Sequence, residues 1–191
     1  MKVGLYFGSF NPIHHGHLLI ASYVLNHTEL QQVWFVVSPQ NPLKPAASLL
    51  NEYHRLHLVK LAVEGEKNLK ASDIEFKLPK PSYTIDTLTY LQEKYPNHEF
   101  SVIMGSDSFQ NLSKWKNADW LLKNYPVYIY KRPGHENLPA YSGALGIHVL
   151  NAPLLPISST DIRKDIKAGR SIRYLVPENV RAEIERSGYY S

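Results

Sequence analysis

The stretch Gly8-Ser9-Phe10-Asn11-Pro12-Ile13-His14-His15-Gly16-His17 follows directly after the apolar run from Val3 to Phe7. A short continuous apolar run predicts a buried strand, and the glycine that follows it predicts a turn. Because Gly8 has no Cβ, a large ligand can approach the backbone there. The turn leads into an amphipathic segment, and we expect its first peptide N–H groups to be unpaired and to favour a phosphate.

Two histidines stand at the start of this amphipathic segment, three residues apart. On a helix, that spacing places His14 and His17 on one side of the first turn, whereas His15 points elsewhere. Taken alone, such a pair also fits an ordinary turn between a strand and a helix, with its histidines at the surface. The strand before the pair and a second phosphate-type pattern near the C-terminus favour an anion-binding site.

Composition limits the class of protein. The chain has 191 residues, of which 43% are hydrophobic, and we expect a single domain over residues 1–191. The Lys and Arg residues behind the net charge of +4 are scattered, so a nucleic-acid groove is not indicated. The absence of cysteine excludes a disulfide scaffold and a thiolate metal site. The N-terminal apolar run is too short for a signal peptide or a membrane span, so we expect a cytoplasmic protein without membrane contact.

Strand-like and helix-like patterns alternate along the chain. Strands are expected at 2–7, 33–37, 71–76, 100–104, 127–130 and 147–150. Helices are expected at 18–25, at 51–64, from a cap at Ser82 to before Pro96, from Asn117 through Leu122, at 159–169 and at 177–188. This alternation predicts an α/β protein with a doubly wound parallel sheet in three α/β/α layers. Ligands of such sheets bind beyond the carboxyl ends of the strands, where the strand order reverses.

A second candidate anion site follows the last expected strand, in Ile157-Ser158-Ser159-Thr160-Asp161-Ile162-Arg163. Hydroxyl residues at a helix start leave backbone N–H groups free and add O–H donors, and Arg163 supplies a planar cation for phosphate oxygens. The same residues also fit a plain helix cap with a surface arginine. Two anion-binding helix starts at one edge of a sheet match a polyphosphate better than a single phosphate.

Further polar and aromatic residues fall at the expected strand ends and helix starts. Gly105 and Asp107 follow the fourth strand, where the carboxylate can accept hydrogen bonds from ribose hydroxyls or cap a helix. Tyr83 and Thr84 begin a helix, and with Trp115 they can hold a flat heterocycle, although such aromatics also occur in cores. Two cations complete the set, with Arg132 after the fifth strand and Lys44 in a proline-rich loop.

One further histidine pair invites a metal interpretation. His54 and His57 have a spacing that permits metal binding on one helix face, yet no third ligand is obvious nearby. A solvated helix face is the better interpretation, so no protein-bound metal site is expected.

Together, these residues resemble a known family. The stretch from Gly8 to His17 is similar to the signature of the nucleotidyltransferase superfamily, whose hallmark is a His-x-Gly-His-like box. Ser158–Arg163 is similar to its C-terminal triphosphate motif. The chain further resembles the bacterial nicotinate mononucleotide adenylyltransferase family in four segments. They are Ser82-Tyr83-Thr84-Ile85-Asp86-Thr87-Leu88, Gly105-Ser106-Asp107, Trp115 and Arg132-Pro133-Gly134. The likeness spans nearly the whole chain and implies a Rossmann-like nucleotidyltransferase fold, with helices from about residue 158 closing an ATP site.

The resemblance implies transfer of AMP from ATP to nicotinate mononucleotide, giving nicotinate adenine dinucleotide and pyrophosphate in NAD biosynthesis, with Mg²⁺ arriving with ATP. It implies catalytic roles for His14, His17 and Arg163. The implied ATP contacts are Gly8, Ser9, Phe10, His14, His17, Gly105, Asp107, Arg132, Ser158, Ser159 and Arg163. The implied mononucleotide contacts are Lys44, Tyr83, Thr84 and Trp115.

The chain departs from the family pattern at two positions, and two other functions also fit its motifs. The family has a glycine pair where this chain has Phe7-Gly8, and an aspartate where it has Asn11. A sibling adenylyltransferase with another phosphate acceptor, such as phosphopantetheine, keeps both phosphate motifs but has no use for a carboxylate site at Tyr83 and Thr84. A nucleotide-binding regulatory module without turnover is a second alternative. Homo-oligomer formation is compatible with the sequence.

Overall fold

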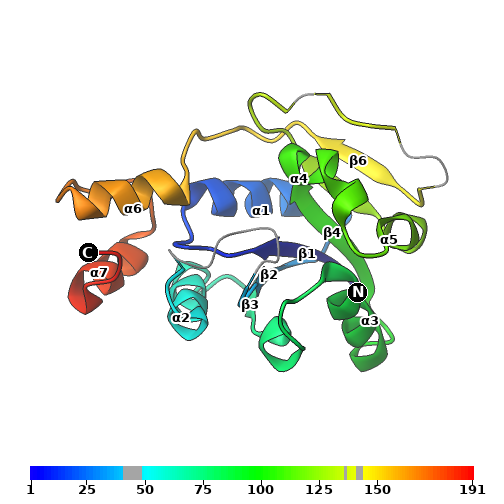
Figure 1. Cartoon of the computed structure of the whole chain (residues 1–191), viewed down its shortest axis with the longest axis horizontal. Coiled ribbons are helices and arrows are strands. Elements are labelled where there is room, and N and C mark those ends of the chain that lie inside the picture. The colour runs from blue at the N-terminus through cyan, green and yellow to red at the C-terminus, as the bar shows by residue number, and fades with distance from the viewer. Residues whose placement is uncertain (41–48, 136, 141–143) are drawn as a thin grey trace.

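Six strands form one parallel sheet within the part of the chain that the structure describes. That structure is a computed structural model, and it describes residues 1–40, 49–135, 137–140 and 144–191. The strand order is β3-β2-β1-β4-β5-β6, and every neighbouring pair is parallel (Figure 1). The strands are β1 (Lys2–Gly8), β2 (Gln32–Val37), β3 (Leu69–Ser72), β4 (Glu99–Gly105), β5 (Val127–Tyr130) and β6 (Ile147–Leu150). The predicted doubly wound parallel sheet is confirmed.

Helices cover both faces of the sheet, because successive strand residues point to opposite sides. In β2, Phe35 packs into the core of one face and Trp34 into the core of the other. The first core also contains residues of α1 (His15–His27), α2 (Glu52–Ala62), α6 (Ser159–Lys167) and α7 (Glu178–Ser187). The second contains residues of α3 (Thr84–Lys94), α4 (Ser106–Gln110) and α5 (Ala118–Asn124). No helix in the described ranges is long and apolar enough to cross a bilayer.

The strand order reverses between β1 and β4. Tyr6 of β1 is in register with Ile103 of β4, so the ends of the two strands, Gly8 and Gly105, lie at the same edge of the sheet. The chain leaves β1 towards β2 and leaves β4 towards β5, which opens a crevice at this point. The fold therefore places the start of the His14–His17 segment beside Asp107.

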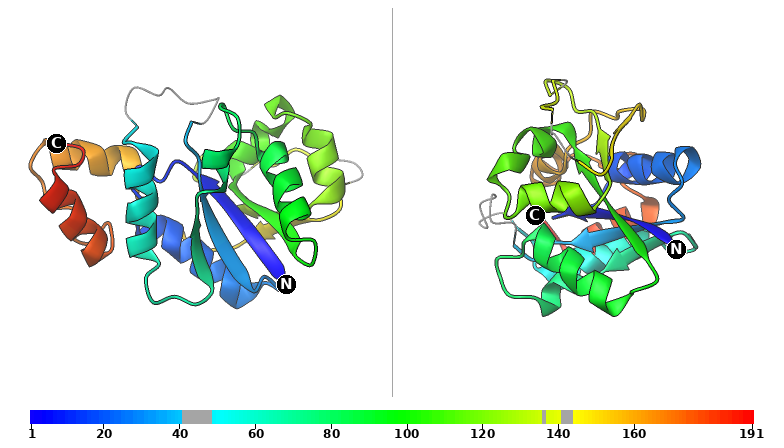
Figure 2. Two further views of the ribbon diagram at one scale, coloured as in Figure 1. Left: turned by 90° about the horizontal axis from the view of Figure 1, so that it is seen from below. Right: turned by 90° about the vertical axis from the view of Figure 1, so that its right-hand side faces the viewer.

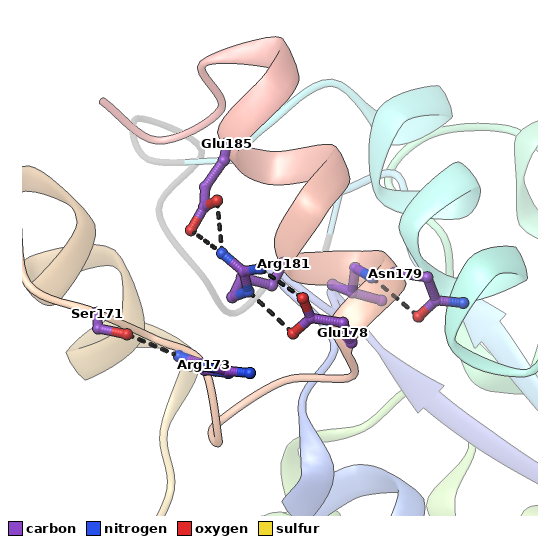
Figure 3. Close-up of polar contacts among 7 residues, drawn as sticks. Ser171, Arg173, Glu178, Asn179, Arg181 and Glu185 are labelled. Atoms are coloured by element: carbon purple, nitrogen blue, oxygen red, sulfur yellow. Dashed lines mark hydrogen bonds and ion pairs between the residues drawn. The ribbon is translucent and has the colours of Figure 1, made fainter.

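The last two helices lie at one end of the molecule, beside α2 (Figures 1 and 2). Arg181 of α7 bonds the carboxylates of Glu178 and Glu185 on the same helix (Figure 3). The Asn179 side chain donates a hydrogen bond to the Leu61 carbonyl of α2 at 2.6 Å. The Asn179 bond joins α7 to α2, whereas the Arg181 pairs lie within α7.

Three predicted element boundaries are wrong. The third strand ends at Ser72, and a 3₁₀ helix, η2 (Ile74–Lys77), replaces its predicted second half. That turn places the carboxylate of Glu75 inside the protein, where three hydroxyls bind it. One of these hydroxyls is that of Ser82, so Ser82 does not cap α3, whose N-cap is Tyr83. The first helix starts at His15, earlier than the apolar pattern indicated.

Candidate active site

Two adjoining cavities open at the carboxyl edge of the sheet. The first, of about 380 Å³, is here named the histidine cavity, and its lining includes Tyr6, His14, His17, Asp107, Tyr130, Arg132 and Ser158. The second, of about 340 Å³, is named the tyrosine–tryptophan cavity, and its lining includes Gly8, Ser9, Glu75, Tyr83, Thr84, Gly105, Trp115 and Tyr130. Tyr130 lines both cavities. The expected mononucleotide contacts Tyr83, Thr84 and Trp115 share one cavity. The expected ATP contacts are divided between the cavities and their surroundings. His14, His17, Asp107, Arg132 and Ser158 line the histidine cavity, Gly8, Ser9 and Gly105 line the tyrosine–tryptophan cavity, and Phe10, Ser159 and Arg163 line neither.

His14 and His17 come together as their spacing predicts. Their rings stack with centroids 3.7 Å apart, and the backbone N–H of His14 donates to Nδ1 of His17 at 3.3 Å. Because Nδ1 of His17 accepts this bond, Nε2 of a neutral His17 carries the ring proton and is a donor. The absence of a Cβ at Gly16 matters here, since a Cβ would lie only 3.0 Å from the His14 ring.

His14 is buried, with 6% of its surface exposed. Burial, with smaller contributions from the nearby Arg132 and His15, lowers the pKa of its imidazole to about 4. At neutral pH the ring is therefore uncharged in the empty protein. His14 can bind phosphate as a neutral donor, or it can take up a proton when an anion arrives.

Two backbone N–H groups at the start of α1 are hydrogen-bonded within the protein, contrary to the expectation from the sequence. The His15 N–H donates to the carbonyl of Leu175, and the His17 N–H donates to the carbonyl of His14, both at 3.0 Å. The expectation of unpaired N–H groups is wrong at these two positions. The reason is tertiary, because the chain between α6 and α7 supplies the Leu175 carbonyl.

The turn before α1 is packed by its own side chains. Phe10 adopts a left-handed backbone conformation (φ 45°), which is unfavourable for a residue with a side chain, and it is held by burial at 2% exposure. Its ring lies over Gly8, where an added Cβ would come within 2.7 Å of Phe10 Cζ. The structure thus gives Gly8 a packing role in addition to the expected close approach of a ligand. The Asn11 side chain, which replaces the family's aspartate, accepts a hydrogen bond from the Leu50 N–H at 3.1 Å.

The two predicted phosphate motifs meet. Arg163 donates to the carbonyl of Asn11 at 2.8 Å across 152 residues of sequence, and the Ser159 hydroxyl donates to the carbonyl of Pro12 at 2.9 Å. The Ser158 hydroxyl caps α6 by accepting from the Asp161 N–H at 3.1 Å, and Ser158 lines the histidine cavity. In this structure Ser159 and Arg163 tie the motifs together through the protein's own carbonyls.

Asp107 and Arg132 form an ion pair across the histidine cavity, with Nε and Oδ1 3.2 Å apart. Arg132 also donates to the Tyr130 hydroxyl at 3.1 Å. A Cβ at Gly105 would crowd Asp107 Oδ1 and lie 2.9 Å from Arg132 Nε, so a larger residue at this position would displace the pair. The expected ribose carboxylate and the expected adenine-side cation therefore contact each other.

In the tyrosine–tryptophan cavity, Tyr83 caps α3 and half-buried Trp115 follows the 3₁₀ helix η3 (Leu112–Lys114). Lys116 also lines the cavity, with its ammonium 5.0 Å from the centre of the Tyr83 ring. The expected mononucleotide contact Lys44 lies outside the described residues.

Two buried ionic residues were missed from the sequence. Arg55 of α2 is 1% exposed, and its guanidinium donates to four backbone carbonyls, those of Ser9, Ser38, Pro39 and Leu50. It lies on the helix face of Leu58 and Val59, so an arginine at an apolar position was the available signal. Glu75 is also 1% exposed, and burial raises the pKa of its carboxyl although hydroxyl donors oppose this.

The pair His54 and His57 contacts α7. Nδ1 of His54 is 2.9 Å from the Tyr189 hydroxyl, and Nε2 of His57 is 3.8 Å from a Glu183 carboxylate oxygen. Across the described ranges, no cluster of three or more His, Cys, Asp or Glu side chains is arranged to hold a metal ion. The two histidines therefore contribute to the contact of α2 with α7 and the residues that follow it.

The geometry agrees with comparison to known proteins. Residues 5–165 match the family model described as cytidylyltransferase-like. The chain belongs to this family. Within it, the chain is 49% identical over 191 residues to a probable nicotinate-nucleotide adenylyltransferase of Flavobacterium psychrophilum, covering 100% of this chain and 99% of the relative. The corresponding protein of Flavobacterium johnsoniae is 50% identical over 192 residues, with the same coverage. This member of the cytidylyltransferase-like family thus belongs to the nicotinate-nucleotide adenylyltransferase group.

The fold is shared with solved structures of lower sequence identity. The nicotinic acid mononucleotide adenylyltransferase of Plasmodium falciparum, complexed with NaAD, superposes with a TM-score of 0.81. It is 20% identical, and the match covers 99% of this chain and 97% of that one. This likeness confirms the Rossmann-like nucleotidyltransferase fold.

Proposed function

We propose that the protein transfers AMP from ATP to nicotinate mononucleotide and releases pyrophosphate and nicotinate adenine dinucleotide. The observation that carries the proposal is the pair of cavities with Tyr130 as a common wall. One cavity holds the stacked histidines, and the other holds Tyr83, Thr84 and Trp115. Two bound phosphates can then meet at the carboxyl edge of β1 and β4. Full-length identity of about half to relatives named for this activity supports the same reaction.

In the proposed reaction, an ionised phosphate oxygen of the mononucleotide attacks the α-phosphorus of ATP. A new P–O bond forms there, and the bond to the pyrophosphate breaks, with its electron pair leaving on pyrophosphate. The nucleophile is already an anion, so no general base is needed, and the protein has to align two polyanions and stabilise the developing charge. The Nε2–H of His17 is directed at the α-phosphate in this scheme, with His14 beside it.

The remaining nucleotide contacts are proposed in the histidine cavity and along its edges. Asp107 and Gly105 would hold the ribose, Arg132 would shape the adenine side, and Ser158, Ser159 and Arg163 at the start of α6 would hold the outer phosphates. Gly8, Ser9 and Phe10 would shape the turn beneath them. The described residues provide no carboxylate cage for Mg²⁺, so in the proposal the ion arrives on the triphosphate with its own water ligands.

The acceptor would bind in the tyrosine–tryptophan cavity. Backbone N–H groups of Tyr83 and Thr84 would receive the nicotinate carboxylate, Trp115 would stack on its ring, and Lys44 would contact its phosphate. The α3 N-terminus is electrostatically suited to a carboxylate. The acid would therefore be preferred over the amide.

An acceptor panel tests the proposal. The purified protein is incubated with ATP, Mg²⁺ and one of nicotinate mononucleotide, nicotinamide mononucleotide or phosphopantetheine, and pyrophosphate and the dinucleotide product are measured. We expect the fastest release with nicotinate mononucleotide. Release with phosphopantetheine alone would establish the sibling activity, and ATP binding without release from any acceptor would establish a regulatory module.

Trp115→Ala should raise the KM for the mononucleotide more than that for ATP, and equal changes would count against stacking.

A further inference from the structure

Tyr6 lies in the central strand β1, and its side chain lines the histidine cavity. It is 2% exposed and surrounded by aromatic rings, with centroid distances of 5.7 Å to Phe10, 5.8 Å to Tyr130 and 6.0 Å to His17. Its ring thus occupies the floor of the cavity between the histidines and the Tyr130 wall. Neither the sequence motifs nor the proposed mechanism gave this residue a role.

The Tyr6 hydroxyl is one of a few buried side-chain polar atoms without a hydrogen-bond partner in the described structure. The others are Ser9 Oγ, His14 Nδ1, His98 Nδ1, Asp107 Oδ1 and the Tyr190 hydroxyl. Tyr6, His14 and Asp107 all line the histidine cavity. Buried polar groups are normally satisfied, so a group of exceptions around one cavity calls for an explanation. Asp107 Oδ1 has its ion pair with Arg132, so the two atoms of this cavity that call for a ligand are His14 Nδ1 and the Tyr6 hydroxyl.

We propose that the Tyr6 hydroxyl is a ligand-contacting group that donates a hydrogen bond to a phosphate oxygen of the bound nucleoside triphosphate. The proposal rests on the proposed function for the identity of the ligand, but it does not depend on the acceptor. A phosphate oxygen is the chemically matched partner because the cavity is flanked by His17 on the side where the phosphates are expected. A hydrogen bond to a charged partner is stronger than one to a neutral partner.

The electrostatics of Tyr6 favour a donor. Burial, together with the neighbouring Tyr130 hydroxyl, raises the pKa of the Tyr6 phenol well above its ordinary value. The hydroxyl therefore keeps its proton across the working pH range and acts neither as a base nor as a nucleophile. The Tyr130 hydroxyl accepts from Arg132 at 3.1 Å, and it is also the polar group beside the Tyr6 hydroxyl in the empty protein. A phosphate oxygen that enters the cavity would take the Tyr6 proton in place of this neighbour, which is the arrangement to test.

The experiment uses the isosteric change Tyr6→Phe, which removes one oxygen and keeps the ring. ATP binding is measured by calorimetry in the absence of any acceptor, and thermal unfolding is measured without ligand. Tyr128→Phe is the matched control, because Tyr128 is a buried tyrosine of β5 that is absent from the lining of both cavities. Losing a hydrogen bond to a charged group typically weakens binding roughly tenfold or more.

We expect the Kd for ATP to rise about tenfold in Tyr6→Phe and to stay unchanged in Tyr128→Phe. The Tm of Tyr6→Phe should be equal to or above that of the parent, since a buried hydroxyl without a partner does not stabilise the empty protein. An unchanged Kd overturns the proposal, and so does a clear fall in Tm, which would show an internal partner for the hydroxyl. If the parent binds ATP but releases no pyrophosphate with nicotinate mononucleotide, the proposed function fails while this test still stands.

Discussion

The histidine cavity and the tyrosine–tryptophan cavity share Tyr130, but their buried polar groups are bonded differently. In the tyrosine–tryptophan cavity, the Glu75 carboxylate accepts hydrogen bonds from Ser38, Ser82 and Thr87, although the Ser9 hydroxyl has no partner. In the histidine cavity, the Tyr6 hydroxyl and His14 Nδ1 are buried without a hydrogen bond, and Asp107 Oδ1 has only its ion pair with Arg132. The comparison indicates that the fold itself satisfies most polar groups of one cavity, whereas the proposed nucleotide would satisfy those of the other.

The largest expected effect concerns Arg55, which binds the carbonyls of Ser9 and Ser38 in the lining of the tyrosine–tryptophan cavity. Arg55→Met leaves the carbonyls of Ser9, Ser38, Pro39 and Leu50 without their common donor. The free energy of unfolding should fall by about 4 kcal/mol, since each buried acceptor without a partner is costly. Urea denaturation measures this, with Lys60→Met on the exposed face of α2 as the control. A loss below about 1 kcal/mol would show that these carbonyls find other donors.

The next largest effect concerns the histidine cavity, where the ATP phosphates are proposed to bind. His17→Ala removes the donor aimed at the α-phosphate and should lower kcat by about a hundredfold, which corresponds to roughly 3 kcal/mol of transition-state stabilisation. Pyrophosphate release under saturating substrates measures it. His15→Ala is the matched control, because His15 is the adjacent histidine and lies outside the lining of both cavities. Equal rates for His17→Ala and the parent would refute the assignment.

The buried imidazole of His14 predicts an acid sensitivity. Its pKa is about 4 when folded and 6.5 when unfolded, so the unfolded chain binds more protons between these values. This contribution to stability is complete above pH 6.5 and is lost as the pH falls towards 4. Between pH 7.5 and 4.5 the parent should lose roughly 2.5 kcal/mol more than His14→Leu. Denaturation of both proteins at the two pH values measures the difference, and parallel losses would contradict the lowered pKa.

The smallest effect concerns the hydrogen-bonded Glu75 carboxylate in the tyrosine–tryptophan cavity. Glu75→Gln keeps the shape of the side chain but replaces one accepting oxygen with an NH₂ donor, so stability should fall by about 2 kcal/mol. ATP affinity should not change, which is the reverse of the result expected for Tyr6→Phe. Denaturation and calorimetry measure the two quantities, with exposed Glu93→Gln on α3 as the control. A drop in ATP affinity would show that the two cavities are not independent.

The sequence predicted much of this site because its strongest signals are local. The apolar run before Gly8, the spacing of His14 and His17, and the hydroxyl residues before Arg163 each depend on neighbours within one turn or strand. The strand boundary near Ser72 and the cap at Ser82 failed, since both follow from the burial of Glu75, whose hydroxyl partners lie 7 to 37 residues away. Arg55 was missed for the same reason, because the carbonyls that it binds lie 5 to 46 residues away.

By itself, the amino-acid sequence determined the alternation of strands and helices, the doubly wound sheet and the two motifs at its carboxyl edge. These follow from hydrophobic periodicity and turn chemistry, which act over a few residues. Only the tertiary structure decided which polar groups are satisfied. It placed the carbonyl of Leu175 on the start of α1, gave Glu75 its three hydroxyls and buried the Tyr6 hydroxyl in the wall of a cavity. Hydrogen-bond partners are set by positions in space, so a residue's neighbours along the chain do not reveal them.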